Sequence, residues 1–290
     1  MEWIRKQCEG RQQIEDTVRH HIPFLEFPLL RETNMVIHGF TTRMGGVSEG
    51  IFSSMNLSFT RGDDPKRVQK NYELAAEALG VSPERIVCSD QTHTTNVRHV
   101  TAKDCGKGLY RKKDYSDVDG MITDEPGLVL AAFFADCVPL FFVDPEKRAV
   151  GLAHSGWRGT AGKMGLCMVS AMEQAFSSRP EDIRAAIGPS ICVDCYEVSE
   201  DVIQEFEKRF DKKTMEEICI SKENGKYQLD LWKANRAVLL EAGVLPEHIA
   251  VTDICTCCNP KKLFSHRASH GQRGNLAAFL SICGQHSDYR

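Results

Sequence analysis

Three residues whose side chains favour divalent metals each end an apolar, strand-like segment or begin the loop beside it. They are His93, Cys137 and His154, in the segments QTH, ADC and AHSG. Two imidazoles and one thiolate suit zinc, and three protein ligands leave a fourth coordination position for water or substrate. Because sites are commonly assembled where strands end, these residues indicate a catalytic metal site.

Spacing alone leaves other interpretations of these residues open. His93 and Cys137 are separated by 43 residues, and Cys137 and His154 by 16, which matches no compact ligand signature. Taken singly, Cys137 could equally be a core thiol, and each histidine could be a hydrogen-bonded structural residue.

Arginines near glycine-rich loops suggest that the site receives an anionic group. The run GWRGT after Ser155 places Arg158 directly before a predicted helix, where backbone N–H groups attract anions. Arg43 and Arg61 lie in polar loops and extend this expectation to phosphate or another polar substrate. The alternative for Arg158 is a glycine turn with a surface arginine.

Two Cys-x-x-Cys pairs, Cys192/Cys195 and Cys255/Cys258, leave a second metal site as an open question. Together they could hold zinc with four thiolates, but 59 residues separate the pairs, and each could be incidental among twelve cysteines. Neither pair follows a strand and opens a clear helix, as a thioredoxin-like redox motif does.

The composition is that of an ordinary globular chain. Its 290 residues are 42% hydrophobic and 26% charged. The net charge of -4 does not indicate binding to nucleic acid or to an anionic membrane. The start lacks the pattern of a secretory signal, and the most apolar segment, 128–143, falls short of the ~18 uninterrupted apolar residues of a membrane span. We therefore expect one domain in the cytoplasm, with reduced cysteines.

Hydrophobic periodicity predicts the elements that must position the candidate residues. A helix over 65–79 is bounded by Asp64-Pro65 and Gly80, which match helix start and stop signals. Further helices are expected over 160–176, 202–210 and 231–239. Strands are expected over 35–40, 118–122, 128–134, 140–143, 149–153, 183–187, 249–254 and 277–282, with those over 118–153 at the centre. This order, without a G-x-G-x-x-G turn, predicts a mixed sheet flanked by helices.

The ordered motifs closely resemble those of the laccase-domain family, also labelled polyphenol oxidases, over nearly the whole chain from about His38. The blocks are HGFTTRMGGVSEGIFSSMNLS from His38, GDDP from Gly62, QTH from Gln91, DVDGMIT from Asp117, ADCVPL from Ala135, AHSGWRGT from Ala153, AAIGPSICVDCYEV from Ala185 and FSHRASHGQRG from Phe264. The last block departs from the family, because Ala268-Ser269-His270 stands where relatives usually have a second arginine and an acidic residue.

The resemblance implies an α/β (α+β) layered sandwich, with two mixed sheets inside and helices outside, similar to toxin deamidases. We expect residues 1–290 to form a single domain, with 1–34 as its N-terminal extension. The family places its metal-binding and catalytic trio at the positions of His93, Cys137 and His154. Zinc is the expected metal, with copper possible at the same site.

The activity that the resemblance implies is purine nucleoside phosphorolysis, acting on adenosine, inosine, guanosine and methylthioadenosine, together with adenosine deamination. Zinc would activate water for attack on the purine carbon that bears the amino group, while Arg43, Arg61 or Arg158 would hold phosphate. The expected partners are a nucleoside and phosphate, with no nucleic acid or membrane, and the oligomeric state stays open.

Three other functions compete with this interpretation. The first is copper-dependent polyphenol oxidation, although the ten histidines include no His-x-His pair for a trinuclear copper cluster. The second is a metal-free hydrolase with Cys137 as nucleophile and His154 as base. The third is a binding module without catalysis.

Overall fold

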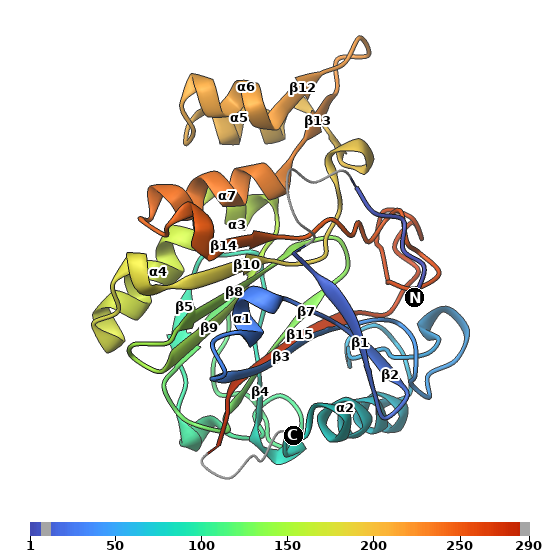
Figure 1. The fold of residues 1–290 in the computed structure, drawn as a ribbon. Helices are drawn as coiled ribbons and strands as arrows, with labels where there is room; N and C mark the ends of the chain where they lie inside the picture. Colours follow the sequence, from blue (N-terminus) through green and yellow to red (C-terminus); the bar gives the residue numbers. More distant parts are fainter. Residues whose placement is uncertain (7–12, 285–290) are drawn as a thin grey trace.

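Two six-stranded sheets form the centre of the molecule in the computed structural model, which describes residues 1–6 and 13–284 (Figure 1). The first sheet contains, in spatial order, β1 (Glu15–Arg19), β2 (Ile22–Glu26), β3 (Val36–Thr41), β15 (Leu276–Ile282), β7 (Val129–Phe134) and β4 (Ile86–Cys88). The second contains β14 (Ile249–Val251), β10 (Arg184–Ile187), β8 (Val138–Asp144), β9 (Ala149–Ser155), β6 (Gly120–Thr123) and β5 (Val97–His99).

Both sheets are mixed. In the first, β7 runs antiparallel to β15 and parallel to β4. In the second, β8 runs antiparallel to β9 and β10, whereas β10 is parallel to β14. The prediction of an α/β sandwich with two mixed sheets is confirmed.

Alternation along the strands builds three apolar layers. Phe134 of β7 and Phe141 of β8 point into the core between the sheets. Their sequence neighbours Phe133 and Phe142 lie on the outer faces of the sheets and pack with the helices. Period-two alternation in nearly all-apolar strands is what a sheet buried on both faces requires.

The helices are α1 (Pro28–Arg31), α2 (Pro65–Leu79), α3 (Trp157–Ala161), α4 (Met164–Phe176), α5 (Glu200–Glu207), α6 (Lys212–Ile218) and α7 (Leu231–Glu241). Helices α2, α4 and α7 cover the outer faces of the two sheets, whereas α1 lies at the core between them and α5 and α6 lie beyond α7 (Figure 1). Helix α2 packs on the first sheet, and α4 and α7 pack on the second. A small sheet of β11 (Glu197–Val198), β13 (Tyr227–Leu229) and β12 (Cys219–Ser221) lies beside α5 and α6.

The helix predicted over 65–79 is confirmed with its caps. The Asp64 carboxylate accepts a hydrogen bond from the Lys66 amide at 2.9 Å, and Gly80 ends the helix with a φ of 68°. A left-handed residue at this position satisfies the last carbonyls of a helix at little cost when it is glycine.

Two sequence predictions about the arrangement of elements are wrong in detail. The single helix expected over 160–176 is broken into α3 and α4, because Lys163 adopts a left-handed conformation with a φ of 61°. The strands expected over 118–153 divide between the sheets, since β7 joins the first sheet and the other three join the second.

Residues 13–34 contribute more than the sequence patterns indicated. Strands β1 and β2 extend the edge of the first sheet, and β2 pairs with β3. No helix in the described part of the chain is long and apolar enough to cross a membrane. The single domain and the cytoplasmic location stay predictions.

Candidate metal centre and substrate cavity

The fold brings the three predicted ligands together from separate loops and strands. His93 lies between β4 and β5, Cys137 lies between β7 and β8, and His154 lies near the end of β9. Their candidate ligand atoms all lie within 4.8 Å of one another, with 3.9 Å between Cys137 Sγ and His93 Nε2. Tetrahedral zinc would set this sulfur–nitrogen separation at about 3.6 Å. The Cys137–His93 separation is therefore close to that of a zinc site, and the chemistry of the three donors fits zinc.

Asp119, immediately before β6, holds two of these ligands in place. Its Oδ1 lies 2.7 Å from His154 Nδ1 and accepts a hydrogen bond from the His93 amide at 3.1 Å. Its Oδ2 accepts from the Thr92 and Thr94 amides at 2.9 and 3.0 Å. The bond to Nδ1 leaves Nε2 of His154 as the ring nitrogen available to a metal, the usual role of a carboxylate behind a histidine ligand.

His93 adopts a backbone conformation that residues other than glycine rarely occupy. Its φ is 67°, in the left-handed region. The three consecutive amides from Thr92 to Thr94 all donate to Asp119, so one buried carboxylate stabilises the turn. This turn aims the His93 ring at His154, with 4.8 Å between ring centroids.

The residue before Cys137 is held in a similar way. Asp136 has a φ of 92°, and its carboxylate accepts hydrogen bonds from Thr256 Oγ1 and the Arg267 amide, both at 2.7 Å. Its carbonyl accepts a bond from the Ile191 amide at 3.0 Å. These contacts fix the β7–β8 turn and therefore the position of the Cys137 sulfur.

Electrostatics favour a charged pair at Cys137 and His154. Burial alone raises the pKa of the Cys137 thiol, but the positive charge of His154 and hydrogen bonds from both histidines lower it to about 6. Burial lowers the pKa of His154, but the Cys137 thiolate and the bond to Asp119 raise it to about 9. In the metal-free protein near neutral pH, thiolate and imidazolium therefore coexist.

A cavity of about 370 Å³ opens beside the trio. This volume falls within the range of roughly 300–1,000 Å³ that is usual for small-molecule sites. Phe59 and Phe133 contribute aromatic surface, and Phe59 stacks on Tyr72 with ring centroids 5.8 Å apart. Arg61 and Arg273 also line this cavity.

The structure separates the three arginines predicted to bind substrate. Arg61 lines the cavity of the trio. Arg43 instead donates hydrogen bonds to the carbonyls of Ser53 and Pro260 and lies over the Phe264 ring, so it joins loops. Arg158 stacks on Trp157 at 4.2 Å and borders a different hollow, and the helix that follows Gly156 has only five residues.

Sequence reasoning missed two residues at the site. Asp119 lies in the DVDGMIT block, but nothing in its spacing marks its carboxylate as the partner of His154. Arg273 is the second-last residue of the FSHRASHGQRG block; it is buried, and its Nε has no hydrogen-bond partner among the described residues. Burial and the nearby Arg61 charge lower the pKa of Arg273 to about 10. An arginine in such surroundings favours an anionic ligand.

Comparison with known proteins places the chain in a family. The model of the family described as multi-copper polyphenol oxidoreductase laccase matches residues 37–283. The chain belongs to this family. Its relatives include purine nucleoside phosphorylase YlmD of Geobacillus stearothermophilus, 41% identical over 250 residues that cover 84% of this chain and 89% of the relative. A purine nucleoside phosphorylase of Bacteroides thetaiotaomicron is 36% identical, covering 89% of this chain and 96% of that protein.

Solved structures show the same family fold. The crystal structure of YlmD from Geobacillus stearothermophilus superposes with a TM-score of 0.86 at 37% identity, covering 94% of this chain and 100% of that one. The Bacillus licheniformis hypothetical protein YfiH superposes with a TM-score of 0.87 at 34% identity, with the same coverage.

The lowered pKa of Cys137 predicts how the metal-free protein reacts with iodoacetamide. Alkylation of Cys137 should rise through a midpoint near pH 6, because the thiolate is the nucleophile and exists above the pKa. Below that pH the reaction should slow about tenfold for each pH unit. Peptide mapping by mass spectrometry measures the rate. His154→Ala should move the midpoint upward, and an unchanged midpoint would show that His154 does not stabilise the thiolate.

Gly156 is predicted to be necessary for the trio to close around a metal. A Cβ at this position would lie 3.0 Å from the His93 ring and 3.1 Å from the Cys137 sulfur. Gly156→Ala should therefore lower zinc affinity at the trio by about tenfold or more, measured by chelator competition. Gly159→Ala is the matched control, because its Cβ would meet no atom closer than 3.5 Å. Equal zinc affinity in the two variants would contradict this role.

Proposed function

We propose that the chain is a zinc-dependent purine nucleoside phosphorylase that acts on adenosine, inosine, guanosine and methylthioadenosine and also deaminates adenosine. The observation that carries the proposal is a single cavity lined by the trio, aromatic rings and two guanidinium groups. The relatives named purine nucleoside phosphorylases support the phosphorolytic activity. Deamination and the range of nucleosides are our own extension.

Phosphorolysis requires the cavity to position three parts of the reaction. A phosphate oxygen forms a bond to the anomeric carbon of the ribose, the bond from that carbon to the purine nitrogen breaks, and the base leaves with the electron pair. Arg61 and Arg273 provide positive charge for phosphate. The exposed ring of Phe59 offers a face for the purine. Arg43 and Arg158, which the sequence suggested as phosphate ligands, lie outside this cavity and are given no role in binding phosphate.

The trio serves both activities from one side of the cavity. Zinc bound there would supply a Lewis acid with an open fourth position. Asp119 keeps the His154 ring oriented, and the His93 turn holds the second imidazole beside it. In deamination, water adds to the purine carbon that carries the amino group, and ammonia leaves.

One observation favours a second candidate, the metal-free cysteine hydrolase. Cys137, His154 and Asp119 form a thiolate, imidazolium and carboxylate series, the arrangement of an activated nucleophile with an oriented base. Such an enzyme would keep its activity in chelator and lose it on alkylation of Cys137. A phosphorylase that depends on zinc would lose activity in chelator and regain it when zinc is added back, and bound zinc would protect its Cys137 from alkylation.

The proposal is tested by incubating metal-analysed protein with adenosine, with and without phosphate. We expect adenine and ribose 1-phosphate only with phosphate, and inosine and ammonia without it. His93→Ala should abolish both reactions. Arg61→Gln should raise the KM for phosphate about tenfold or more, because a charge-assisted contact is worth about 1.5–3 kcal/mol, and leave deamination nearly unchanged.

Arg158→Gln is the control for that experiment, since Arg158 lies outside the cavity. An Arg61→Gln enzyme with an unchanged KM for phosphate would remove Arg61 from the phosphate site. Zinc-loaded protein that converts adenosine under neither condition would refute the proposed function and return attention to phenol and amide substrates.

A further inference from the structure

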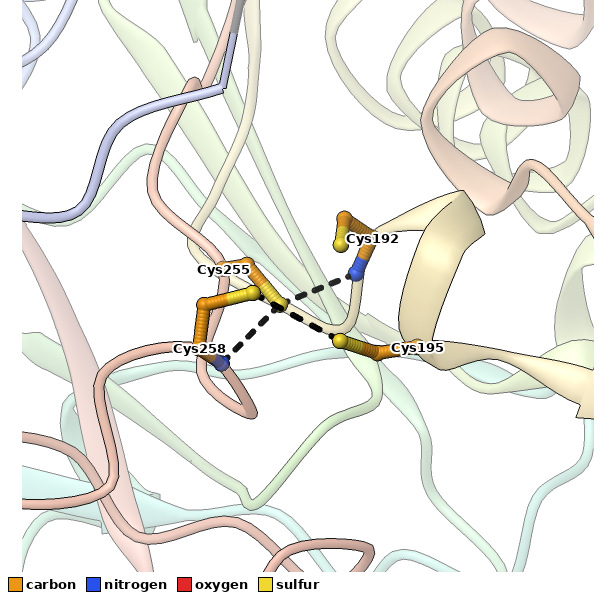
Figure 2. Close-up of side chains that lie close together, drawn as sticks. All are labelled: Cys192, Cys195, Cys255 and Cys258. Atoms are coloured by element: carbon orange, nitrogen blue, oxygen red, sulfur yellow. Dashed lines mark hydrogen bonds between the residues drawn. The ribbon is translucent and has the colours of Figure 1, made fainter.

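Four cysteines outside the trio meet at one end of the second sheet. Strands β10 and β14 are parallel, with Ile187 opposite Val251, and Ser190 forms a bridge with Cys255 beyond the strand ends. The two Cys-x-x-Cys pairs therefore leave the sheet side by side, although 59 residues separate them in sequence. Figure 2 shows the side chains of Cys192, Cys195, Cys255 and Cys258 pointing toward one another.

The geometry of the sulfur atoms matches a tetrahedral metal centre. All four lie within 4.8 Å of one another, and Cys195 Sγ is 3.5 Å from Cys258 Sγ. Zinc–sulfur bonds of about 2.3 Å place tetrahedral ligands about 3.8 Å apart. A disulfide requires about 2.05 Å, so Cys195 and Cys258 are free thiols in this structure.

The Cys255 sulfur accepts hydrogen bonds from two backbone amides. The Cys192 amide donates to it at 3.2 Å and the Cys258 amide at 3.4 Å (Figure 2). Donation to sulfur stabilises its anionic form. Cys192 and Cys255 are buried. Unpaired thiolates in such a place would be costly, whereas a divalent cation neutralises them and satisfies the sulfur lone pairs.

We propose that Cys192, Cys195, Cys255 and Cys258 bind a zinc ion with four thiolates, as a structural site separate from the trio. Two Cys-x-x-Cys pairs with no fourth position left open are the pattern of structural zinc. This assignment does not depend on the proposed activity.

The proposed zinc site also reaches the Cys137 turn through two short connections. Thr256, next to Cys255, donates to the Asp136 carboxylate at 2.7 Å. Arg267, whose amide donates to the same carboxylate, also donates from its side chain to the Cys195 carbonyl at 3.1 Å. The zinc would therefore tie together the two segments that fix Asp136. Zinc at this site would therefore stabilise the β7–β8 turn through the Thr256 and Arg267 hydrogen bonds to Asp136.

The test is made in the full chain carrying His93→Ala, Cys137→Ala and His154→Ala, in which the trio cannot hold metal. Protein purified under reducing conditions should contain one zinc per chain by mass spectrometry of the metal. Zinc X-ray absorption should report four sulfur ligands at about 2.3 Å. Adding Cys195→Ser and Cys258→Ser should remove the zinc, whereas adding Cys219→Ser, at a thiol outside the cluster, should not.

Three results would overturn this site. They are a triple variant without zinc, zinc bound mainly by nitrogen or oxygen, and retention of zinc after both cysteines are replaced. The absorption spectrum is measured before those cysteines are changed, so misfolding of the cysteine variants cannot hide a failure. Replacement of zinc by cobalt(II) gives a second readout, because a four-thiolate cobalt centre has intense sulfur-to-cobalt charge-transfer bands.

Discussion

One buried carboxylate, that of Asp119, organises the candidate metal centre. It binds the His154 ring on one oxygen and accepts three consecutive amides from the His93 turn across both oxygens. Burial raises the pKa of Asp119, but the bonds from His154 and from these amides outweigh this effect and lower it. The group therefore stays ionised while it is fully buried. Without it, the left-handed turn at His93 and the orientation of His154 would both lose their support.

The two-sheet sandwich explains why a single carboxylate can do this. The strands are fixed by apolar side chains on both faces, so loops at the same end meet at defined positions. Asp119 immediately precedes β6, which pairs with β9 so that Gly120 lies opposite Ala153. The Asp119 carbonyl also accepts the His154 amide at 2.8 Å. Sheet pairing therefore sets the Asp119–His154 contact before any metal binds.

Much of this architecture could be predicted from the sequence, for physical reasons that differ between elements. Helix α2 carries a strong apolar period between an Asp-Pro start and a glycine stop, so its bounds were predicted correctly. The proximity of His93, Cys137 and His154 could be predicted because these residues stand at the ends of apolar strands and in the motifs of the family that the chain resembles. The break between α3 and α4 at Lys163 could not be predicted, because a lysine does not indicate a left-handed backbone conformation.

The remaining site residues depend on three-dimensional contacts that local patterns do not encode. The chain has 40 acidic residues, and only the pairing of β6 with β9 selects Asp119. Arg43 and Arg61 both lie in polar loops, yet Arg43 joins two loops and Arg61 lines the cavity. The cysteine pairs looked incidental because the sequence does not reveal that β10 and β14 are parallel neighbours.

The most direct measurement is the free zinc concentration that protects Cys137 half-maximally from alkylation, in the native chain and in Asp119→Asn. We expect this concentration to rise about 10–100-fold in the variant, the usual effect of losing a carboxylate behind a histidine ligand. Asp144→Asn is the matched control, since Asp144 is equally buried and also accepts backbone amides, but at the other end of β8. An unchanged concentration in Asp119→Asn would contradict the central role of this carboxylate.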